Sequence, residues 1–234
     1  MTAHPFTLAG ARLAALPSGA LHWADAGLLV VSDLHLGKSE RLARRGGTLL
    51  PPYDTAETLS RLEADIAATD PRAVICLGDS FDDNAAARDL PPGAEERLLR
   101  LMAGRRWVWI AGNHDPGPAS LPGTHLAELR EGPLTFRHIA RPGETGEISG
   151  HYHPKARLSL GGRRVSRPCF LVDTARVILP AFGAYTGGLA MDAPVLDALM
   201  AQGAVAILTG VRAVALPMRP AHARLPRPRP GSAG

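Results

Sequence analysis

Residues 27–35 read GLLVVSDLH, an unbroken apolar run that ends in a carboxylate and an imidazole. A continuous run of Leu and Val predicts a strand buried on both faces, as in a parallel sheet covered by helices. The pattern recurs at 73–80, AVICLGDS, and at 107–114, WVWIAGNH. Segments with helical spacing separate these runs and fall at 38–45, 53–68 and 95–102. The first half of the chain therefore predicts a parallel βαβ sheet.

The second half of the chain is rich in short strand patterns. They fall at 134–137, 146–149, 164–172, 175–179, 204–209 and 213–216, with a helix predicted at 192–201. Residues 5–24 alternate weakly between turn signals and predict a short leading hairpin. We find no repeat and no linker before Pro217, so a second sheet is expected to pack on the first.

Length and composition are those of an ordinary soluble domain. The 234 residues are 45% hydrophobic and 21% charged, which excludes a disordered chain. No apolar run approaches the roughly 20 residues of a membrane span, and the N-terminus lacks a secretion pattern. Two cysteines, Cys76 and Cys169, exclude a disulfide scaffold and a Cys-rich zinc site. We therefore expect a cytoplasmic protein with no membrane partner.

The net positive charge lies at the C-terminal end. The chain has 26 basic and 22 acidic residues, and residues 219–234 hold four arginines and no acid. This Pro/Arg-rich segment predicts a disordered tail after a single domain at 1–218. Two interpretations of the tail stay open: a solubilising end, or a weak electrostatic handle for polyanions.

Polar clusters follow four of the predicted strands. They are Asp33 and His35, Asp79 with Asp82 and Asp83, Asn113 with His114 and Asp115, and His151 with His153. Ligands of open α/β sheets bind at the carboxyl ends of the strands, so these clusters are expected to converge. Carboxylate, amide and imidazole without thiolate favour Mn, Fe or Zn over the oxygen cages of Ca²⁺ and Mg²⁺.

The number of these groups indicates more than one ion. Residues two apart in an extended segment point to one side, which pairs Asp33 with His35 and His151 with His153. Two such pairs, a further carboxylate and an amide are too many for one tetrahedral ion. They fit two metals that together clamp a phosphoryl group during an in-line displacement.

The motifs DxH, GDxxD, GNH(D/E), a lone His and GHxH stand in this order over residues 30–154. The pattern resembles the calcineurin-like metallophosphoesterase superfamily. The resemblance implies an α/β fold, a four-layer αββα sandwich of two mixed sheets flanked by helices.

The same resemblance implies a role for each motif residue. Asp33, His35 and His153 would hold one metal, Asn113, His138 and His151 a second, and Asp79 would bridge both. His114 would lie beside the phosphate, stabilising charge and protonating the leaving oxygen, with Asp115 orienting it. Asp82 and Asp83 would be supporting or loop groups rather than ligands. Two positions depart from the pattern, since Ile139 and Asn84 stand where the family often has glycine.

A narrower resemblance extends over residues 21–189. It includes SDLHLGKSERLARRGGTLLPPYD, LGDSFDD, GEISGHYHPKARL, RPCFL and LPAFGAYTGGL. These segments are similar to the bacterial ligase-associated DNA damage-response endonucleases of the PdeM type. That resemblance implies a phosphodiesterase or endonuclease that acts on DNA with two divalent ions, Mn²⁺ first and Fe or Zn as alternatives. It also implies partnership in DNA repair with an ATP-dependent DNA ligase, a helicase and a second nuclease.

Basic residues near the motifs are candidates for binding a DNA backbone. They are Lys38, Arg41, Arg44, Arg45 and Lys155, with Arg157 nearby. The alternative for the helical group is a solvated face. No recognition helix or zinc finger is present, so binding is expected through phosphates and not through sequence. Residues 179–189 are expected to be either a loop folded over the metals or a tight inter-strand turn.

Two other functions remain open at this stage. One is hydrolysis of small phosphodiesters such as cyclic nucleotides or nucleotide sugars. The other is a non-catalytic repair scaffold that uses the tail, which the full ligand set disfavours.

Overall fold

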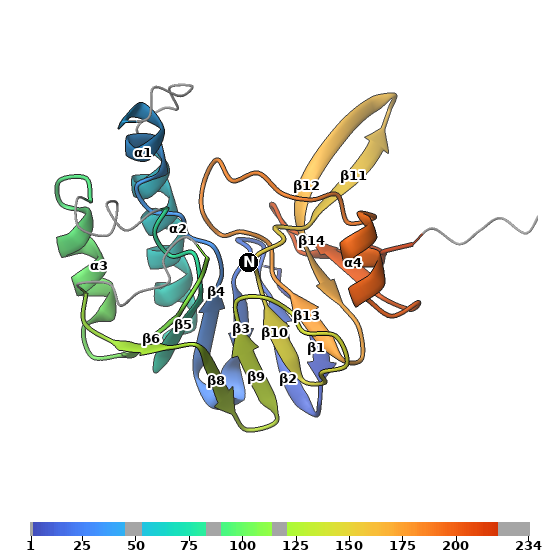
Figure 1. Ribbon diagram of the computed structural model, residues 1–234, viewed down its shortest axis with the longest axis horizontal. Helices are drawn as coiled ribbons and strands as arrows, with labels where there is room; N and C mark the ends of the chain where they lie inside the picture. Colours follow the sequence, from blue (N-terminus) through green and yellow to red (C-terminus); the bar gives the residue numbers. More distant parts are fainter. Residues whose placement is uncertain (1, 45–52, 83–89, 114–120, 220–234) are drawn as a thin grey trace, which may run out of the picture.

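Two β-sheets face each other in a computed structural model of the chain (Figure 1). The structure describes residues 2–44, 53–82, 90–113 and 121–219. The apolar faces of the two sheets meet in one core, and helices lie on the outer faces. This arrangement confirms the predicted α/β sandwich.

The first sheet has seven strands in the order of the chain. They are β1 (His4–Leu8), β2 (Ala11–Ala15), β3 (Leu21–Trp23), β4 (Leu28–Val31), β5 (Ala73–Leu77), β6 (Arg106–Ile110) and β7 (Thr124–Leu126). The strands are antiparallel from β1 to β4 and parallel from β4 to β7. The expected leading hairpin is therefore a three-stranded meander, which joins the parallel strands through the short 3-10 helix η1 (Ala24–Ala26) and makes the sheet mixed.

The second sheet has eight strands. Its path β15-β14-β12-β13-β10-β9-β8 contains β8 (Glu128–Glu131), β9 (Leu134–Arg137), β10 (Glu147–Ser149), β12 (Arg163–Val172), β13 (Arg176–Ile178), β14 (Val205–Leu208) and β15 (Val214–Pro217). A further strand, β11 (Lys155–Leu160), pairs with β12. The sequence did not predict β7, β8 or β11. These three strands have few buried residues and lack an apolar run.

Successive side chains of the central strands point to opposite faces of the sheet, so each strand packs on both sides. In β5, Ile75 and Leu77 enter the core between the sheets, whereas Val74 and Cys76 pack against helices. In β12, Phe170 lies in the core between the sheets. Strands buried on both faces appear as unbroken apolar runs, which is the pattern that marked them in the sequence.

Helices cover both outer faces. Two lie on the first sheet, α2 (Asp54–Thr69) and α3 (Ala94–Met102), and α4 (Pro194–Leu199) lies on the second, while α1 (Lys38–Arg44) lies above α2 at the top of Figure 1. The helix predicted at 192–201 is shorter than expected because Pro194 sets its first turn. No helix in the described ranges is long and apolar enough to cross a membrane.

The two cysteines, Cys76 and Cys169, are buried and free. Arg219, the first residue of the predicted tail, is bound to α4, since its guanidinium donates to Asp197 Oδ1 at 2.6 Å and to the Ala201 carbonyl at 2.6 Å. The rest of that predicted tail lies outside the described residues.

Candidate metal centre

The polar clusters come together where strands of both sheets end. Asp33 follows β4, Asp79 follows β5 and Asn113 follows β6 of the first sheet. His138 follows β9, and His151 and His153 follow β10 of the second sheet. The site therefore lies at the shared edge of the two sheets, as predicted from the carboxyl ends of the strands.

The candidate ligand atoms form two groups. Asp33, His35 and His153 make one group, and Asp79, His138 and His151 make the other. Within each group the ligand atoms lie within 4.8 Å of one another. The motif resemblance implied similar sets, but it placed Asp79 in both groups and gave the second group Asn113, whose amide oxygen is described next.

The contacts of the two ring nitrogens of His138 indicate what the second group can bind. Its Nδ1 donates to the Leu77 carbonyl at 2.8 Å, which leaves Nε2 to accept. That Nε2 lies 2.9 Å from Asn113 Oδ1, 3.2 Å from His151 Nδ1 and 3.4 Å from Asp79 Oδ2. A carboxylate, an amide oxygen and two imidazole nitrogens thus converge on one point. Such a set of acceptors fits a cation between them.

The electrostatics of the group agree with this geometry. Burial alone lowers the pKa of His138, but the hydrogen bond of Asp79 and the charges of Asp33 and Asp79 outweigh it and raise the pKa. Burial and the charge of His138 lower the pKa of His151. The two carboxylates thus favour positive charge at this point, and the neutral imidazole of His151 is the form that can bind a metal.

Asp33 is the fully buried carboxylate of the first group. Its Oδ1 lies 2.9 Å from His153 Nε2, and its Oδ2 accepts from Ser32 Oγ and, at 3.0 Å, from the His151 backbone. Burial raises the pKa of Asp33, but the hydrogen bond and charge of His153, with His138 and Ser32, bring it below its usual value. The carboxylate is therefore ionised and aimed at His153.

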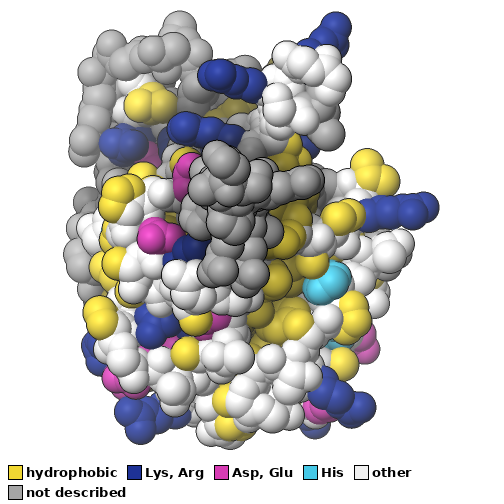
Figure 2. All heavy atoms as spheres, turned by 90° about the vertical axis from the view of Figure 1, so that its right-hand side faces the viewer, with side chains coloured by type: hydrophobic (Ala, Val, Ile, Leu, Met, Phe, Trp, Pro, Cys, Tyr) yellow, Lys and Arg dark blue, Asp and Glu magenta, His cyan; other side chains and the backbone are white. Residues whose placement is uncertain are grey.

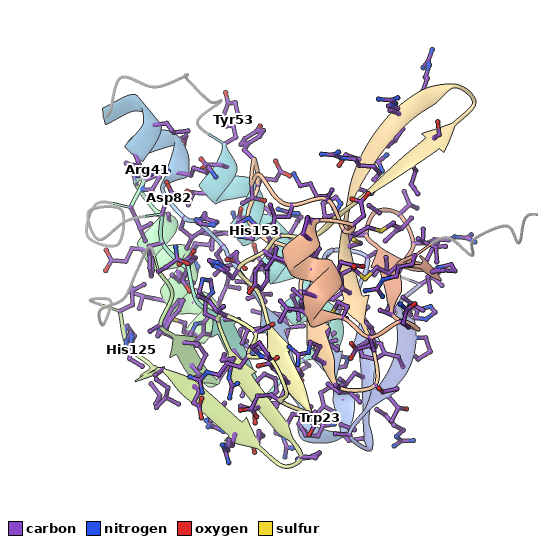
Figure 3. All side chains as sticks on the ribbon, turned by 45° about the vertical axis from the view of Figure 1, so that its right-hand side comes forward. Trp23, Arg41, Tyr53, Asp82, His125 and His153 are labelled. Atoms are coloured by element: carbon purple, nitrogen blue, oxygen red, sulfur yellow. The ribbon has the colours of Figure 1, made fainter. Side chains whose placement is uncertain are left out.

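His35 is oriented by a carboxylate behind it. Asp82 Oδ1 lies 3.0 Å from His35 Nδ1, so Nε2 is the atom directed to the first group. The other oxygen of Asp82 accepts from Arg41 Nε, and Figure 3 shows Arg41 and Asp82 side by side at α1. Asp82 thus supports a candidate ligand, the role the sequence predicted for it, although Asp83 lies outside the described residues.

The backbone at the candidate ligands adopts an unusual conformation. Asp33, His35, Asp79, His151 and His153 have φ between +45° and +71°. Each such non-glycine residue costs about 1–3 kcal/mol and persists only where its surroundings impose it. Here the two loops hold each other, since the amides of Asp33 and His35 donate to the Gly78 and Asp79 carbonyls. Strained backbone conformations of this kind gather at functional sites, and here they coincide with the candidate ligands.

Glycine is required at two positions of the motifs because atoms of other residues approach the backbone closely there. A Cβ on Gly78, at φ +75°, would lie 2.5 Å from His138 Nδ1 and 2.9 Å from the Gly112 Cα. A Cβ on Gly150 would overlap Ser32 Oγ and come within 2.5 Å of Asp33 Oδ2. The glycines of GDxxD and GHxH thus bring the two sheets into contact at the site.

Residues 179–189 brace the site and are not a tight inter-strand turn. The Gly183 amide donates to the Asp33 carbonyl at 3.0 Å, and the Leu189 amide donates to the Tyr152 carbonyl at 3.2 Å. From α2, Arg61 donates to the Phe182 carbonyl at 2.6 Å. The segment therefore contacts the loops of the first group through backbone atoms.

The candidate substrate-binding residues differ in their surroundings. Lys38 and Lys155 are half-buried beside the site, and Lys155 Nζ donates to the Thr186 carbonyl at 2.8 Å. Burial lowers the pKa of Lys155, and the nearby charge of Lys38 lowers it further. Arg41 is not free to follow a DNA backbone or to form a solvated face, because it pairs with Asp82.

Several predicted residues cannot be placed. His114, Asp115, Arg45 and the side chain of Arg44 lie outside the described residues. The sequence analysis missed Ser32 and the Leu77 carbonyl, whose hydrogen bonds orient Asp33 and His138. A serine directly after the apolar strand β4 was the one signal in the sequence, whereas a backbone carbonyl leaves none.

Comparison with known proteins identifies the class. The family model of the calcineurin-like phosphoesterases matches residues 27–166, so the chain belongs to that family and is a hydrolase of phosphoester bonds. This confirms the resemblance drawn from the motifs. Membership also implies the use of divalent metal ions, which the donor set of the site fits.

A solved structure gives the finer relationship. The chain is similar to a nuclease MPE of Pseudomonas putida, with a TM-score of 0.72 and 30% sequence identity. The match covers 92% of this chain and 100% of that one. No protein in the curated collection of sequences matches this chain.

Proposed function

We propose that this protein is a phosphodiesterase that cleaves DNA at a dinuclear metal centre. The observation that carries the proposal is the convergence of two adjacent groups of acceptors at the edge of the sheets. Family membership supports phosphoester hydrolysis, and the full-length likeness to a nuclease supports a nucleic-acid substrate. Cleavage without sequence preference follows from the lack of any base-reading motif.

We assign the ligands by group. Asp33, His35 and His153 hold one ion, Asn113, His138 and His151 hold the other, and Asp79 belongs to both. Hard oxygen and imidazole donors suit Mn²⁺, and Fe or Zn fit the same set. When bound, the ions supply charge neutralisation at the phosphate and activation of water.

The protein's own groups position and support these ligands. Asp82 and the Leu77 carbonyl fix the ring orientations of His35 and His138, so each presents Nε2 to the centre. Ser32 and the His151 amide hold the Asp33 carboxylate. By the motif resemblance, His114 stabilises charge on the phosphate and protonates the leaving oxygen, with Asp115 orienting it.

Lys38 and Lys155 are the proposed contacts to phosphates beside the scissile bond. Each follows a ligand motif closely, three residues after His35 and two after His153. The narrower resemblance extends the proposal to cytoplasmic DNA repair together with an ATP-dependent ligase, a helicase and a second nuclease. Phosphate-dominated binding predicts activity that falls steeply with salt.

The test compares wild type with Asp79→Asn, each with and without Mn²⁺. The substrates are bis(p-nitrophenyl) phosphate and a labelled DNA circle, and Asp25→Asn on the surface is the matched control. We expect nicking of the circle by wild type and Asp25→Asn only with Mn²⁺, and none by Asp79→Asn. Diester hydrolysis without nicking would favour a small phosphodiester as substrate. No hydrolysis of either substrate by metal-loaded wild type would contradict the proposal and favour a scaffold.

A further inference from the structure

The β11–β12 hairpin extends beyond the second sheet. Residues 163–168 of β12 pair with β11 alone, and pairing of β12 with β14 begins only at Cys169. Gly161 and Gly162 form the turn, with φ of +55° and +76°. Figure 1 shows the hairpin projecting on the same side of the molecule as α1. A six-residue strand such as β11 reaches about 20 Å.

The hairpin is strongly basic. Residues 155–168 contain one lysine, four arginines and no acidic residue. Within the described ranges, no ion pair involves the arginines, which are Arg157, Arg163, Arg164 and Arg167. Several arginines elsewhere pair with acids, as Arg12 does with Asp25 and Arg106 with Glu131, although the exposed Arg72 and Arg212 have no such ion pair among the described residues. The topmost Lys and Arg side chains in Figure 2 likewise protrude with no acidic side chain beside them.

Strand register divides these charges between two faces. Directly paired residues share a face, so one face carries Lys155, Arg157, Ser159, Arg164, Ser166 and Pro168. The opposite face carries Ala156, Leu158, Val165, Arg163 and Arg167. The first face is polar apart from Pro168 at its base, whereas the second mixes apolar side chains with its two arginines.

Alternation along β12 shows where each face points. Phe170 lies in the core between the sheets, so Arg164 and Ser166 continue the face that looks toward the first sheet. Cys169 lies in the core under α4, and Arg167 continues that outer face. We call residues 155, 157, 159, 164 and 166 the inner face of the hairpin.

The inner face begins at the metal centre. Lys155 lies two residues after His153, and its ammonium binds the Thr186 carbonyl of the segment that braces Asp33. Figure 3 shows His153 to the left of the base of the hairpin. A line of cations therefore leads from the candidate ligands outward along β11.

We propose that the inner face is an arm that binds successive backbone phosphates of the DNA strand entering or leaving the metal centre. Guanidinium groups free of carboxylate partners bind phosphate oxygens in pairs of hydrogen bonds, and the two serines can donate to the same oxygens. The inference rests on the proposed function, since it assigns the surface that holds that substrate.

The test compares two variants of equal charge. Arg157→Ala/Arg164→Ala removes the inner arginines, and Arg163→Ala/Arg167→Ala removes the outer ones. Steady-state cleavage of a labelled single-stranded DNA with Mn²⁺ is measured at several salt concentrations. Each lost contact to a single strand lowers the slope of log kcat/KM against log salt by about 0.7, so the inner variant is expected to lose about 1.4. It should raise KM and keep kcat, and the outer variant should change the slope by less than half as much.

The outcomes distinguish binding by the arm from a general effect of net charge. They also distinguish failure of the arm proposal from failure of the proposed function. Equal effects of the two variants, or no effect of the inner one, would overturn the arm. Wild type that cleaves bis(p-nitrophenyl) phosphate but no DNA would overturn the proposed function instead. Metal content and melting temperature check that each variant is folded. Arg157→Gln/Arg164→Gln, which keeps the long side-chain stems, replaces the alanine variant if that one unfolds.

Discussion

The carboxylate of Asp82 links the candidate metal centre to helix α1. One oxygen lies 3.0 Å from His35 Nδ1 and the other accepts from Arg41. Burial raises the pKa of Asp82, but the hydrogen bonds and charges of His35 and Arg41 outweigh it and lower the pKa. The carboxylate therefore stays ionised and fixes the ring of His35 at neutral pH.

Asp82→Asn is expected to weaken metal binding by about 10–100-fold, because the ring of His35 loses the carboxylate that orients it. The measurement is equilibrium Mn²⁺ binding, with Asp25→Asn as the control, since that carboxylate pairs with Arg12 on the surface. Unchanged affinity in Asp82→Asn would show that His35 needs no such support.

Gly78 and Gly104 make a matched pair because both have φ of +75°. A Cβ on Gly78 meets His138 at 2.5 Å, whereas a Cβ on Gly104 has nothing within 4 Å. Alanine at either position costs about 1–2 kcal/mol for the left-handed backbone. Only Gly78→Ala should also lose metal, as measured by metal content after dialysis. Equal metal content in the two variants would contradict the contact with His138.

At the scale of elements, a buried ion cluster ties together three strands of the second sheet. Glu147 of β10 binds Arg137 of β9 at 2.9 Å and Arg176 of β13 at 3.1 Å, and its side chain is 0% exposed. It also accepts from the Arg141 amide at 2.8 Å. Glu147 therefore holds both ends of the loop that begins with His138.

Glu147→Ala should destabilise the fold by about 3–5 kcal/mol, because it leaves two buried arginines without their shared partner. Glu131→Ala is the control, since that residue pairs with Arg106 on the surface and should cost about 1 kcal/mol or less. Urea unfolding measures both. Similar losses in the two variants would mean that the buried cluster adds nothing beyond a surface pair.

In α2, Asp65 introduces a pH dependence of stability. Burial raises its pKa, and the hydrogen bond of Ser18 and the charge of Arg61 offset this only in part. The folded state then holds the proton more tightly than the unfolded state, whose pKa is about 3.9, so stability falls as pH rises through the folded-state pKa.

Asp65→Asn removes this titration and should melt at a higher temperature than wild type at pH 7. The difference should shrink as the pH falls toward 4, where the native carboxyl is protonated. Melting curves across this pH range measure it. A variant that melts at or below the wild-type temperature at pH 7 would show that the buried charge is well compensated.

At the scale of the whole molecule, the sequence predicted most of what places the site. Strands buried on both faces, such as β4 and β5, are unbroken apolar runs. The polar residues that follow these strands are of the types that bind metal ions. The approach of Asp33 to His153 across two sheets could be expected because both follow strand ends. Family motifs supplied the pairing of residues into two groups.

What the sequence could not predict depends on contacts between distant segments. Arg41 looked like a surface cation on a helix, and only the position of Asp82 turns it inward. Glu147 begins β10, and nothing in the sequence marks it as a buried carboxylate, yet it is fully buried and pairs with Arg137 and Arg176. The hairpin strand β11 was missed because most of its residues are not buried, so no hydrophobic pattern marks it.

The central claim is that one shared edge of two sheets holds two metal ions. Crystals of the wild-type protein grown with Mn²⁺ test it through anomalous scattering. Two peaks are predicted, one among Asp33, His35 and His153 and the other among Asp79, His138 and His151. A single peak, or none at these side chains in protein that hydrolyses phosphodiesters, would contradict the claim.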